Sequence, residues 1–254
     1  MIHARCDLYS EALELSTSMT VLLPQATTTQ IGMGGTVRAH GTPVLYLLHG
    51  LSDDDTVWLR RTSIERYAAE LGLAVVMPQV HRSFYTDMER GGRYWEFISE
   101  ELPRIVHSSF TVSDRPEDTF VAGLSMGGYG AMKLALRHPD RFAAAGSLSG
   151  VLDIGAAALI EELRPLFTSI WGDRSPAGSD DDLLHLLDTA EAKRLPRLWA
   201  TCGTEDVLLP HQQAFVAAAR SHGVDLVADE HPGEHEWGFW DQHIQRFLEW
   251  LPLR

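Results

Sequence analysis

The chain has 254 residues, 44% of them hydrophobic, and 21 basic against 35 acidic side chains give it a formal net charge of −14. This hydrophobic content excludes a disordered chain. The negative charge repels phosphate backbones and anionic lipids, so we expect neither a nucleic acid nor a membrane partner. Cys6 and Cys202 are too few for a disulfide framework or a four-cysteine zinc site, and we expect reduced thiols.

The amino-terminal segment lacks the pattern of a signal peptide, because Asp7, Glu11 and Glu14 interrupt any apolar run. No stretch of sequence approaches the roughly 20 apolar residues that a membrane-spanning helix requires. We therefore expect a cytoplasmic protein.

Short apolar runs typical of strands alternate along the chain with helical patterns. After two strand-like runs within 4–23 and a Thr- and Gly-rich loop at 25–40, we expect strands at 44–48, 73–77, 119–122, 142–148, 197–202 and 225–230. We expect helices at 63–71, 94–107, 129–138, 212–221 and 237–251. This order predicts an α/β fold in which helices cover both faces of a mostly parallel central sheet.

The alternation stops between residues 150 and 194. This segment contains one helical stretch at 160–171, a polar turn at 172–179 and an acidic run at 180–182. We interpret residues 151–194 as a small cap-like insertion over the strand ends. Because the chain has no internal repeat or low-complexity linker, we expect a single domain over 1–254.

The pentapeptide 123–127 has the sequence Gly-Leu-Ser-Met-Gly and lies between an expected strand and an expected helix. About 0.1 matches to G-x-S-x-G arise by chance in a chain of this composition, so the prediction depends on this context. A nucleophile elbow exposes its serine at such a strand-to-helix turn, and flanking glycines relieve the crowding. We predict that Ser125 is a nucleophile; the alternative is a turn that binds an anion or nothing.

A serine nucleophile needs a base and an orienting carboxylate, which follow in the order Ser, Asp or Glu, His in this fold. Asp206 follows the strand at 197–202 and is the predicted acid, with Asp153 as the alternative and Glu205 as a solvated turn residue. His235 is the predicted base, because it lies in a Pro- and Gly-containing loop after the last strand. The other late histidines are His211, which begins a helix, His231, which ends a strand, and His222 and His243, which we place on helix surfaces.

His231 and His235 have the spacing of a helical zinc pair, but Pro232 and Gly233 disfavour a helix there and no third ligand is evident. The acidic runs at 53–55 and 180–182 are better explained as solvated loops than as cation sites. We therefore expect no metal.

Acyl transfer also requires N–H donors for the tetrahedral oxyanion. We predict the backbone N–H of Met126, which follows the nucleophile, and that of Leu51, which follows the strand at 44–48. Gly50 lets this loop approach the substrate, and His49 orients it. Among the aromatic residues, Trp58 and Tyr129 are the expected members of a substrate pocket.

Six motifs in family order resemble the esterase D-like branch of the α/β-hydrolases, above all bacterial tributyrin and short-chain acetyl esterases. They are Leu47-Leu48-His49-Gly50-Leu51-Ser52, Glu100-Glu101-Leu102-Pro103, Gly123-Leu124-Ser125-Met126-Gly127-Gly128-Tyr129-Gly130-Ala131, Ser147-Leu148-Ser149-Gly150, Cys202-Gly203-Thr204-Glu205-Asp206 and Gly233-Glu234-His235-Glu236-Trp237. Related branches are the S-formylglutathione hydrolases, feruloyl esterases and mycolyltransferases. The resemblance implies the same roles for Ser125, Asp206 and His235, and the same oxyanion donors.

We therefore expect a serine carboxylesterase that hydrolyses short-chain acyl esters through an acyl-enzyme, needs no cofactor and takes a small-molecule ester. The resemblance makes a homo-oligomer plausible. The alternatives are an S-formylglutathione hydrolase, a feruloyl or acetyl-sugar esterase, an acyltransferase and a non-catalytic binding module of the same fold. S-formylglutathione hydrolases usually carry a cysteine in the loop where this sequence has Leu51-Ser52-Asp53.

Overall fold

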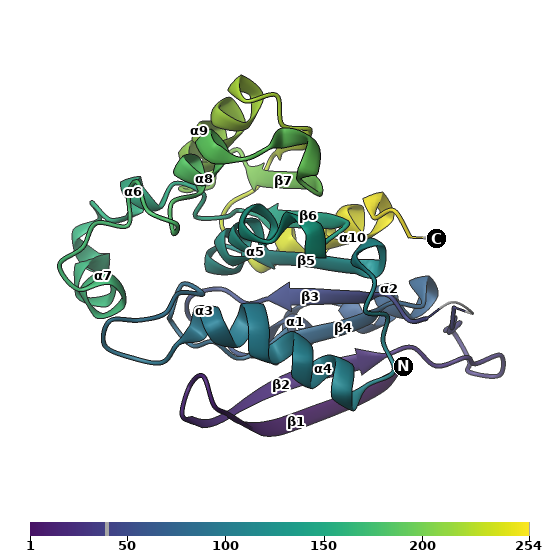
Figure 1. Ribbon diagram of the computed structural model, residues 1–254. Helices are drawn as coiled ribbons and strands as arrows, with labels where there is room; N and C mark the ends of the chain where they lie inside the picture. Colours follow the sequence, from purple (N-terminus) through teal and green to yellow (C-terminus); the bar gives the residue numbers. More distant parts are fainter. Residues whose placement is uncertain (39–40, 254) are drawn as a thin grey trace.

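The computed structural model describes residues 1–38 and 41–253, and these residues form an eight-stranded sheet in the order β1-β2-β4-β3-β5-β6-β7-β8 (Figure 1). The strands are β1 (Ile2–Ser10), β2 (Leu15–Leu23), β3 (Val44–Leu48), β4 (Ala74–Pro78), β5 (Thr119–Leu124), β6 (Ala144–Leu148), β7 (Arg197–Gly203) and β8 (Leu226–His231). β2 pairs antiparallel with β1 and β4, and every other neighbouring pair is parallel. The predicted mostly parallel sheet is confirmed.

Helices cover both faces of this sheet, as predicted. They are α1 (Val57–Arg61), α2 (Ile64–Leu71), α3 (Tyr94–Glu96), α4 (Leu102–Ser109), α5 (Met126–Arg137), α6 (Ile154–Ala157), α7 (Arg164–Trp171), α8 (Leu183–Thr189), α9 (Leu209–Ser221) and α10 (Trp237–Trp250). A π-helical turn, η1 (Phe97–Glu101), joins α3 to α4, and short 3₁₀ turns are η2 (Pro116–Asp118), η3 (Pro139–Arg141), η4 (Glu161–Leu163) and η5 (Ala192–Arg194).

The alternation of side chains along β3 divides the core into two layers. Val44, Tyr46 and Leu48 pack with residues of α4, α5, α8 and α9. Leu45 and Leu47 point to the other face and pack with residues of α1, α2 and α10. Because successive side chains of a strand point to opposite faces, a central strand covered on both sides must be apolar throughout.

One shift in an element boundary concerns the helix after the serine. The sequence pattern predicts its start at residue 129, whereas α5 begins at Met126 and Ser125 is its N-cap residue. Glycines at 127, 128 and 130 weaken the helical pattern, but close packing on the sheet overrides that low propensity. The predicted loop at 25–40 is mostly exposed and has one bridge, between Thr27 and Gly35; residues 39 and 40 lie outside the described residues.

Residues 151–194, which we call the insertion segment, contain α6, α7 and α8. Figure 1 shows α6 and α7 beyond the carboxyl ends of the parallel strands, on the side where β3 ends, and α8 beside α5 and α9. The loops that carry Ser125, Asp206 and His235 leave the sheet at this same edge.

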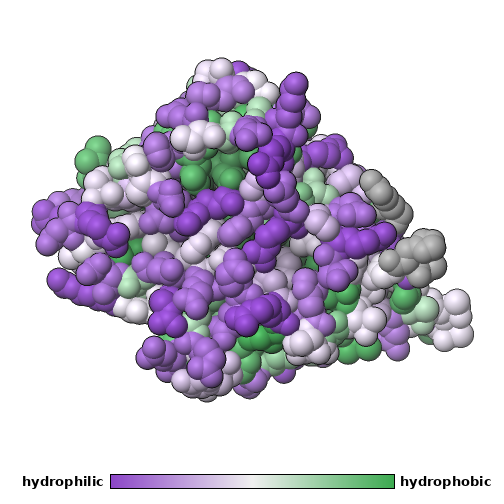
Figure 2. Space-filling model, in the orientation of Figure 1, coloured by the Kyte–Doolittle hydropathy of each residue, from purple (hydrophilic) through white to green (hydrophobic). Residues whose placement is uncertain are grey.

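Figure 2 shows the face that carries α3, α4 and α5 covered mostly by hydrophilic residues, with hydrophobic residues in small separate groups. In the part of the chain that the structure describes, no helix has the length and hydrophobicity needed to cross a membrane.

Candidate active site

Ser125 occupies a sharp turn between β5 and α5 with a strained backbone. Its φ and ψ angles are 52° and −118°, in a region that L-residues rarely adopt. The Ser125 N–H donates to the Leu148 carbonyl of the neighbouring strand at 2.9 Å. The backbone of Gly127 approaches β3 so closely that only glycine fits, since a Cβ there would lie 2.4 Å from the carbonyl oxygen of Leu48. This is the strand-turn-helix geometry that the G-x-S-x-G pattern predicts.

The structure brings Ser125, Asp206 and His235 together in one hydrogen-bonded chain. His235 Nε2 lies 3.2 Å from Ser125 Oγ, and His235 Nδ1 lies 2.9 and 3.1 Å from the two carboxylate oxygens of Asp206. The three residues follow β5, β7 and β8. Because the carboxyl ends of parallel strands meet at one edge of a sheet, residues 110 positions apart in sequence become neighbours there.

The side chain of Asp206 is fully buried, yet it stays ionised. Burial alone would raise its pKa, but hydrogen bonds from His235 and from the Leu208 N–H, at 2.8 Å, lower the pKa of Asp206 below its ordinary value. The ionised carboxylate of Asp206 accepts a hydrogen bond from the protonated Nδ1 of His235. This fixes the imidazole tautomer that leaves Nε2 free to accept from the Ser125 hydroxyl.

The loops that carry Asp206 and His235 are joined by their own hydrogen bonds. The Glu205 N–H donates to the Gly233 carbonyl at 3.1 Å, and the Gly233 N–H donates to the Glu205 carboxylate at 2.7 Å. Gly203 allows this contact, since a Cβ there would lie 2.1 Å from the Gly233 carbonyl oxygen. Glu205 is exposed, as predicted, but it also fastens the base loop to the acid loop.

Trp240 supports the His235 imidazole from α10. The two rings meet edge to face at 4.8 Å and 84°, and Trp240 Nε1 donates to Ser149 Oγ at 3.2 Å. Trp237 packs edge-on against Trp240, and Trp58 packs edge-on against Trp237. The sequence pattern does not single out Trp240. Its position in the first turn of the helix after the histidine loop is the signal that points to this supporting role.

The loop after β3 lies next to the serine. A Cβ built on Gly50 would point toward Ser125, 3.8 Å from its Cβ. His49 is buried, and its Nε2 accepts the Val80 N–H at 3.1 Å, so Nδ1 carries the proton and donates to the Gly50 carbonyl at 2.7 Å. Burial lowers the pKa of His49 and keeps it neutral. His49 therefore orients this loop, as predicted.

The predicted oxyanion donors are the backbone N–H groups of Leu51 and Met126. Leu51 follows Gly50, and Met126 is the first residue of α5. Neither N–H makes a hydrogen bond within residues 1–38 and 41–253. Unsatisfied donors at the start of a helix are suited to an oxyanion.

The sequence predicts that Trp58 and Tyr129 line a substrate pocket, but both side chains are buried in the core. The Trp58 side chain is 1% exposed and donates from Nε1 to the Leu48 carbonyl, within the core layer of α1 and α10. Tyr129 is completely buried, and its hydroxyl donates to the backbone carbonyl of Asp181 at 2.7 Å. Both positions suit a structural role: Trp58 packs against Trp237, and the Tyr129 hydrogen bond connects α5 to the insertion segment.

The interpretation of both acidic runs as solvated loops holds for the exposed Asp180 but is wrong for Asp55 and Asp181. Asp55 is buried and accepts hydrogen bonds from Ser18, Thr20 and Arg5. Asp181 forms an ion pair of 2.6 Å with Lys133, whose side chain is completely buried. Such buried carboxylates need specific partners, and sequence proximity does not reveal partners from other elements.

Several other polar residues that the sequence brings forward lie outside the hydrogen-bonded chain. Asp153 caps α6 by accepting the Ala156 N–H, and His211 lies beside its backbone. His243 is wrongly placed on a surface in the sequence analysis: it is 1% exposed and stacks on Phe239 and His231. In the described residues, no three His, Cys, Asp or Glu side chains converge to hold a metal ion.

Comparison with known proteins identifies the family of this chain. The sequence profile of the Esterase family matches residues 10–251. An acetyl esterase of Caldicellulosiruptor saccharolyticus is 30% identical over 96% of both chains. A mycolyltransferase, Ag85A of Mycobacterium leprae, is 33% identical over 80% of this chain and 72% of its own.

Solved structures give the same picture. FphF, a fluorophosphonate-binding serine hydrolase of Staphylococcus aureus, superposes with a TM-score of 0.88 at 34% identity over 98% of both chains. The S-formylglutathione hydrolase FrmB of the same organism superposes at 0.85 with 35% identity, also over 98% of both chains. The chain therefore belongs to the Esterase family, and it is a carboxylic ester hydrolase with the α/β-hydrolase fold.

Proposed function

We propose that this protein is a serine carboxylesterase that hydrolyses short-chain acyl esters, with Ser125 as nucleophile, His235 as base and Asp206 as orienting acid. The observation that carries the proposal is the continuous hydrogen-bonded chain from the buried Asp206 through His235 to Ser125 Oγ. A binding module of the same fold has no need to keep all three groups aligned. The similarity to an acetyl esterase supports a small acyl group.

In the first half of the reaction, Ser125 Oγ attacks the ester carbonyl carbon while its proton passes to His235 Nε2. The N–H groups of Leu51 and Met126 stabilise the oxyanion of the tetrahedral intermediate. The C–O bond to the alcohol then breaks, and the imidazolium returns its proton to the departing alkoxide. The acyl group remains as an ester on Ser125.

In the second half, water takes the place of the alcohol. His235 removes a proton from the water as its oxygen attacks the acyl carbon, and then protonates Ser125 Oγ as the carboxylic acid leaves. Asp206 stabilises the imidazolium in both halves. Each cycle thus consumes one ester and one water and releases one alcohol and one acid.

The nucleophile assignment is tested with Ser125→Ala. We expect kcat for p-nitrophenyl butyrate to fall by about 10⁴–10⁶, and labelling by a fluorophosphonate to be lost. Ser147→Ala is the matched control, because Ser147 lies buried in the adjacent strand β6, and it should keep activity and labelling. Wild-type hydrolysis by the Ser125→Ala protein would refute the proposal.

The acyl and leaving groups are tested by comparing kcat/KM for p-nitrophenyl acetate, butyrate and octanoate with that for S-formylglutathione. A maximum at acetate or butyrate with weak thioester turnover is expected. A preference for S-formylglutathione would instead favour the second candidate, an S-formylglutathione hydrolase, which the 35% identity to FrmB supports. Hydrolysis of feruloyl or acetyl-sugar esters, or transfer to an added alcohol, would indicate the other branches.

A cytoplasmic location is part of the proposal. Cys6 and Cys202 are both free thiols, and burial raises the pKa of Cys202 to about 12, so that it is an unreactive thiol. A homo-oligomer remains a prediction, which sedimentation velocity of the purified protein would test. A small-molecule ester as the sole partner is also a prediction, and the substrate series tests it.

A further inference from the structure

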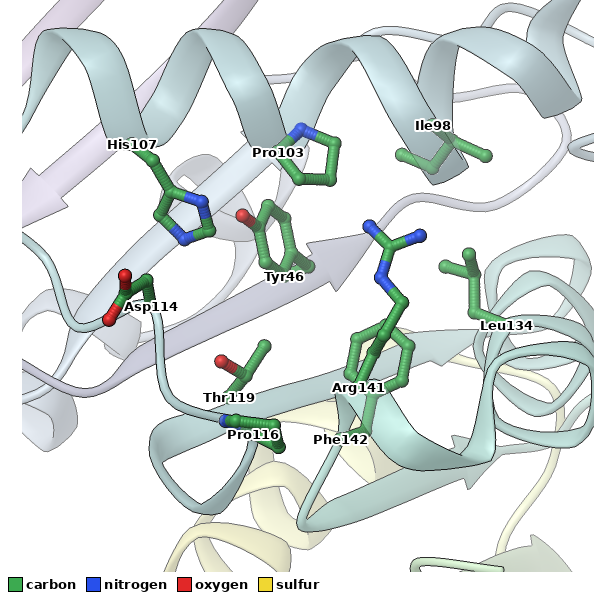
Figure 3. A pocket seen from close by; sticks show the side chains of 10 residues that line it. All are labelled: Tyr46, Ile98, Pro103, His107, Asp114, Pro116, Thr119, Leu134, Arg141 and Phe142. Atoms are coloured by element: carbon green, nitrogen blue, oxygen red, sulfur yellow. The ribbon is translucent and has the colours of Figure 1, made fainter.

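A second cavity lies beside the amino-terminal halves of the central strands, away from Ser125 (Figure 3). Tyr46 lies in the middle of β3, and Thr119 is the first residue of β5. Ser125 follows the other end of β5, which at about 3.3 Å per residue places it about 20 Å from Thr119. The cavity is lined by Tyr46, Ile98, Pro103, His107, Asp114, Pro116, Thr119, Leu134, Arg141 and Phe142.

The cavity has a buried apolar floor and a polar rim. Ile98, Leu134 and Phe142 are buried, whereas His107 and Asp114 are exposed. Its volume is about 90 Å³. A dry cavity of about 150 Å³ in another protein holds benzene, with six carbons, so this space accommodates an apolar body of about four carbons.

The Tyr46 hydroxyl is the polar group of this floor that lacks a partner. Tyr46 is 4% exposed, and its hydroxyl makes no hydrogen bond within the described residues. The hydroxyl of Thr119, in contrast, donates to the Arg115 carbonyl. Burying an unpaired hydroxyl costs free energy that a bound acceptor would recover.

Arg141 brings a positive charge to this cavity. Figure 3 shows the Tyr46 hydroxyl on the side of the ring that faces His107, with the guanidinium of Arg141 across the ring. Arg141 is held at the rim by Glu100, 3.2 Å away. Burial raises the pKa of Tyr46, while the charge of Arg141 acts in the opposite direction. The hydroxyl therefore stays protonated at neutral pH and donates, and the nearby charge favours a negatively charged acceptor.

We propose that this cavity binds a small carboxylate, whose oxygen accepts from Tyr46 and lies near Arg141 while its alkyl body packs on Ile98, Leu134 and Phe142. The inference does not depend on the role of Ser125. Short carboxylic acids are also the products of the proposed reaction, so the test must separate this cavity from the active site.

The test is a ¹⁹F NMR titration of the full chain with 4,4,4-trifluorobutyrate, repeated after treatment with a fluorophosphonate and with the Ser125→Ala variant. Tyr46→Phe keeps the shape of the floor and removes the donor, and Arg141→Gln removes the charge. Arg104→Gln is the matched control, because Arg104 is an exposed cation on the adjacent helix α4 that does not line the cavity. The neutral alcohol 4,4,4-trifluorobutanol tests the need for a carboxylate.

We expect the dissociation constant to rise about tenfold in Tyr46→Phe and severalfold in Arg141→Gln, and to be unchanged in Arg104→Gln. Binding should survive both changes at Ser125, whether or not esterase activity is found. The proposal would be overturned if no saturable binding were found, or if the affinity were unchanged in Tyr46→Phe. It would also be overturned by equal affinity for the alcohol, or by loss of binding after either change at Ser125.

Discussion

At the scale of single residues, the candidate site depends on a few groups that hydrogen bonds and packing hold in place. Asp206 is buried and bonded through both oxygens, and His235 is held between Asp206 and Trp240. Ser125 is held in a strained backbone conformation by its N–H bond to β6. This preorganisation means that no group has to be reoriented when the substrate binds.

Replacing Asp206 by Asn should lower kcat by about 10⁴, because a neutral amide favours the wrong imidazole tautomer and does not stabilise the imidazolium. Steady-state kinetics with p-nitrophenyl butyrate provides the measurement. Asp153→Asn is the matched control: Asn caps a helix as well as Asp does, so α6 and the activity should both persist. If the Asp153 variant lost activity and the Asp206 variant kept it, the acid would have been misassigned.

Replacing Gly127 by Ala should lower the free energy of unfolding by about 1–3 kcal/mol, because the new methyl group would overlap the Leu48 carbonyl. Urea unfolding followed by tryptophan fluorescence would measure the change. Gly34→Ala is the control, since no atom lies within 4 Å of a Cβ there. Equal effects of the two substitutions would show that the elbow is not tightly packed.

At the scale of elements, the insertion segment is attached to α5 through polar contacts. Lys133 donates to the Tyr85 carbonyl and the Thr86 hydroxyl and pairs with Asp181, which also accepts from Trp171 Nε1. Burial lowers the pKa of Lys133 to about 8 in spite of the opposing effect of Asp181. One carboxylate thus joins the helix that follows Ser125 to the segment beyond the strand ends.

Lys133→Met should destabilise the protein by about 3–5 kcal/mol, because it leaves Asp181 partly buried without its counter-ion. Asp181→Asn in the same background should recover part of that loss. A double-mutant cycle from urea unfolding would then give a coupling of about 1–3 kcal/mol. Arg137→Met removes a partly exposed cation from the same helix and should have a much smaller effect. Additive effects at 133 and 181 would contradict a functional ion pair.

At the scale of the whole molecule, the sheet separates two cores, and the two sites lie toward opposite ends of its parallel strands. The candidate active site lies at the carboxyl edge of the parallel strands, and the carboxylate cavity beside their amino-terminal halves. The long helix α10 covers one face and carries His243 inward, where it lies against Phe239, His231 and Arg246. Burial, with the charges of His231 and Arg246, lowers the pKa of His243 to about 4.

The low pKa of His243 makes stability depend on pH in a defined direction. Between pH 6.5 and 4 the unfolded chain binds a proton at this residue that the folded chain does not, so stability falls as the pH falls. The contribution is about 3 kcal/mol. The free energy of unfolding of His243→Phe, measured with urea, should therefore fall by about 3 kcal/mol less than that of the wild type between pH 6.5 and 4. His3→Phe, at an exposed position, should follow the wild type; parallel curves for all three proteins would refute the prediction.

Local sequence patterns were sufficient to predict the strands, the main helices and the turn at Ser125. Chain order and strand ends also restrict the acid and the base to a few candidates, and the structure places the predicted Asp206 and His235 in one hydrogen-bonded chain with Ser125. Patterns were misleading for His243, Asp55 and Asp181. Each of these polar residues lies in a segment that reads as exposed, but His243 and Asp55 are buried and Asp181 is partly buried, and all three contact residues of other elements.

The sequence alone determined the alternation of strands and helices, the family and the elbow, because these depend on the spacing of neighbouring residues. Only the tertiary structure decided that His235 packs against Trp240, that Lys133 and Asp181 join α5 to the insertion segment, and that Tyr46 lines a cavity. These features depend on how elements pack against each other. Packing brings together side chains that no short-range pattern relates.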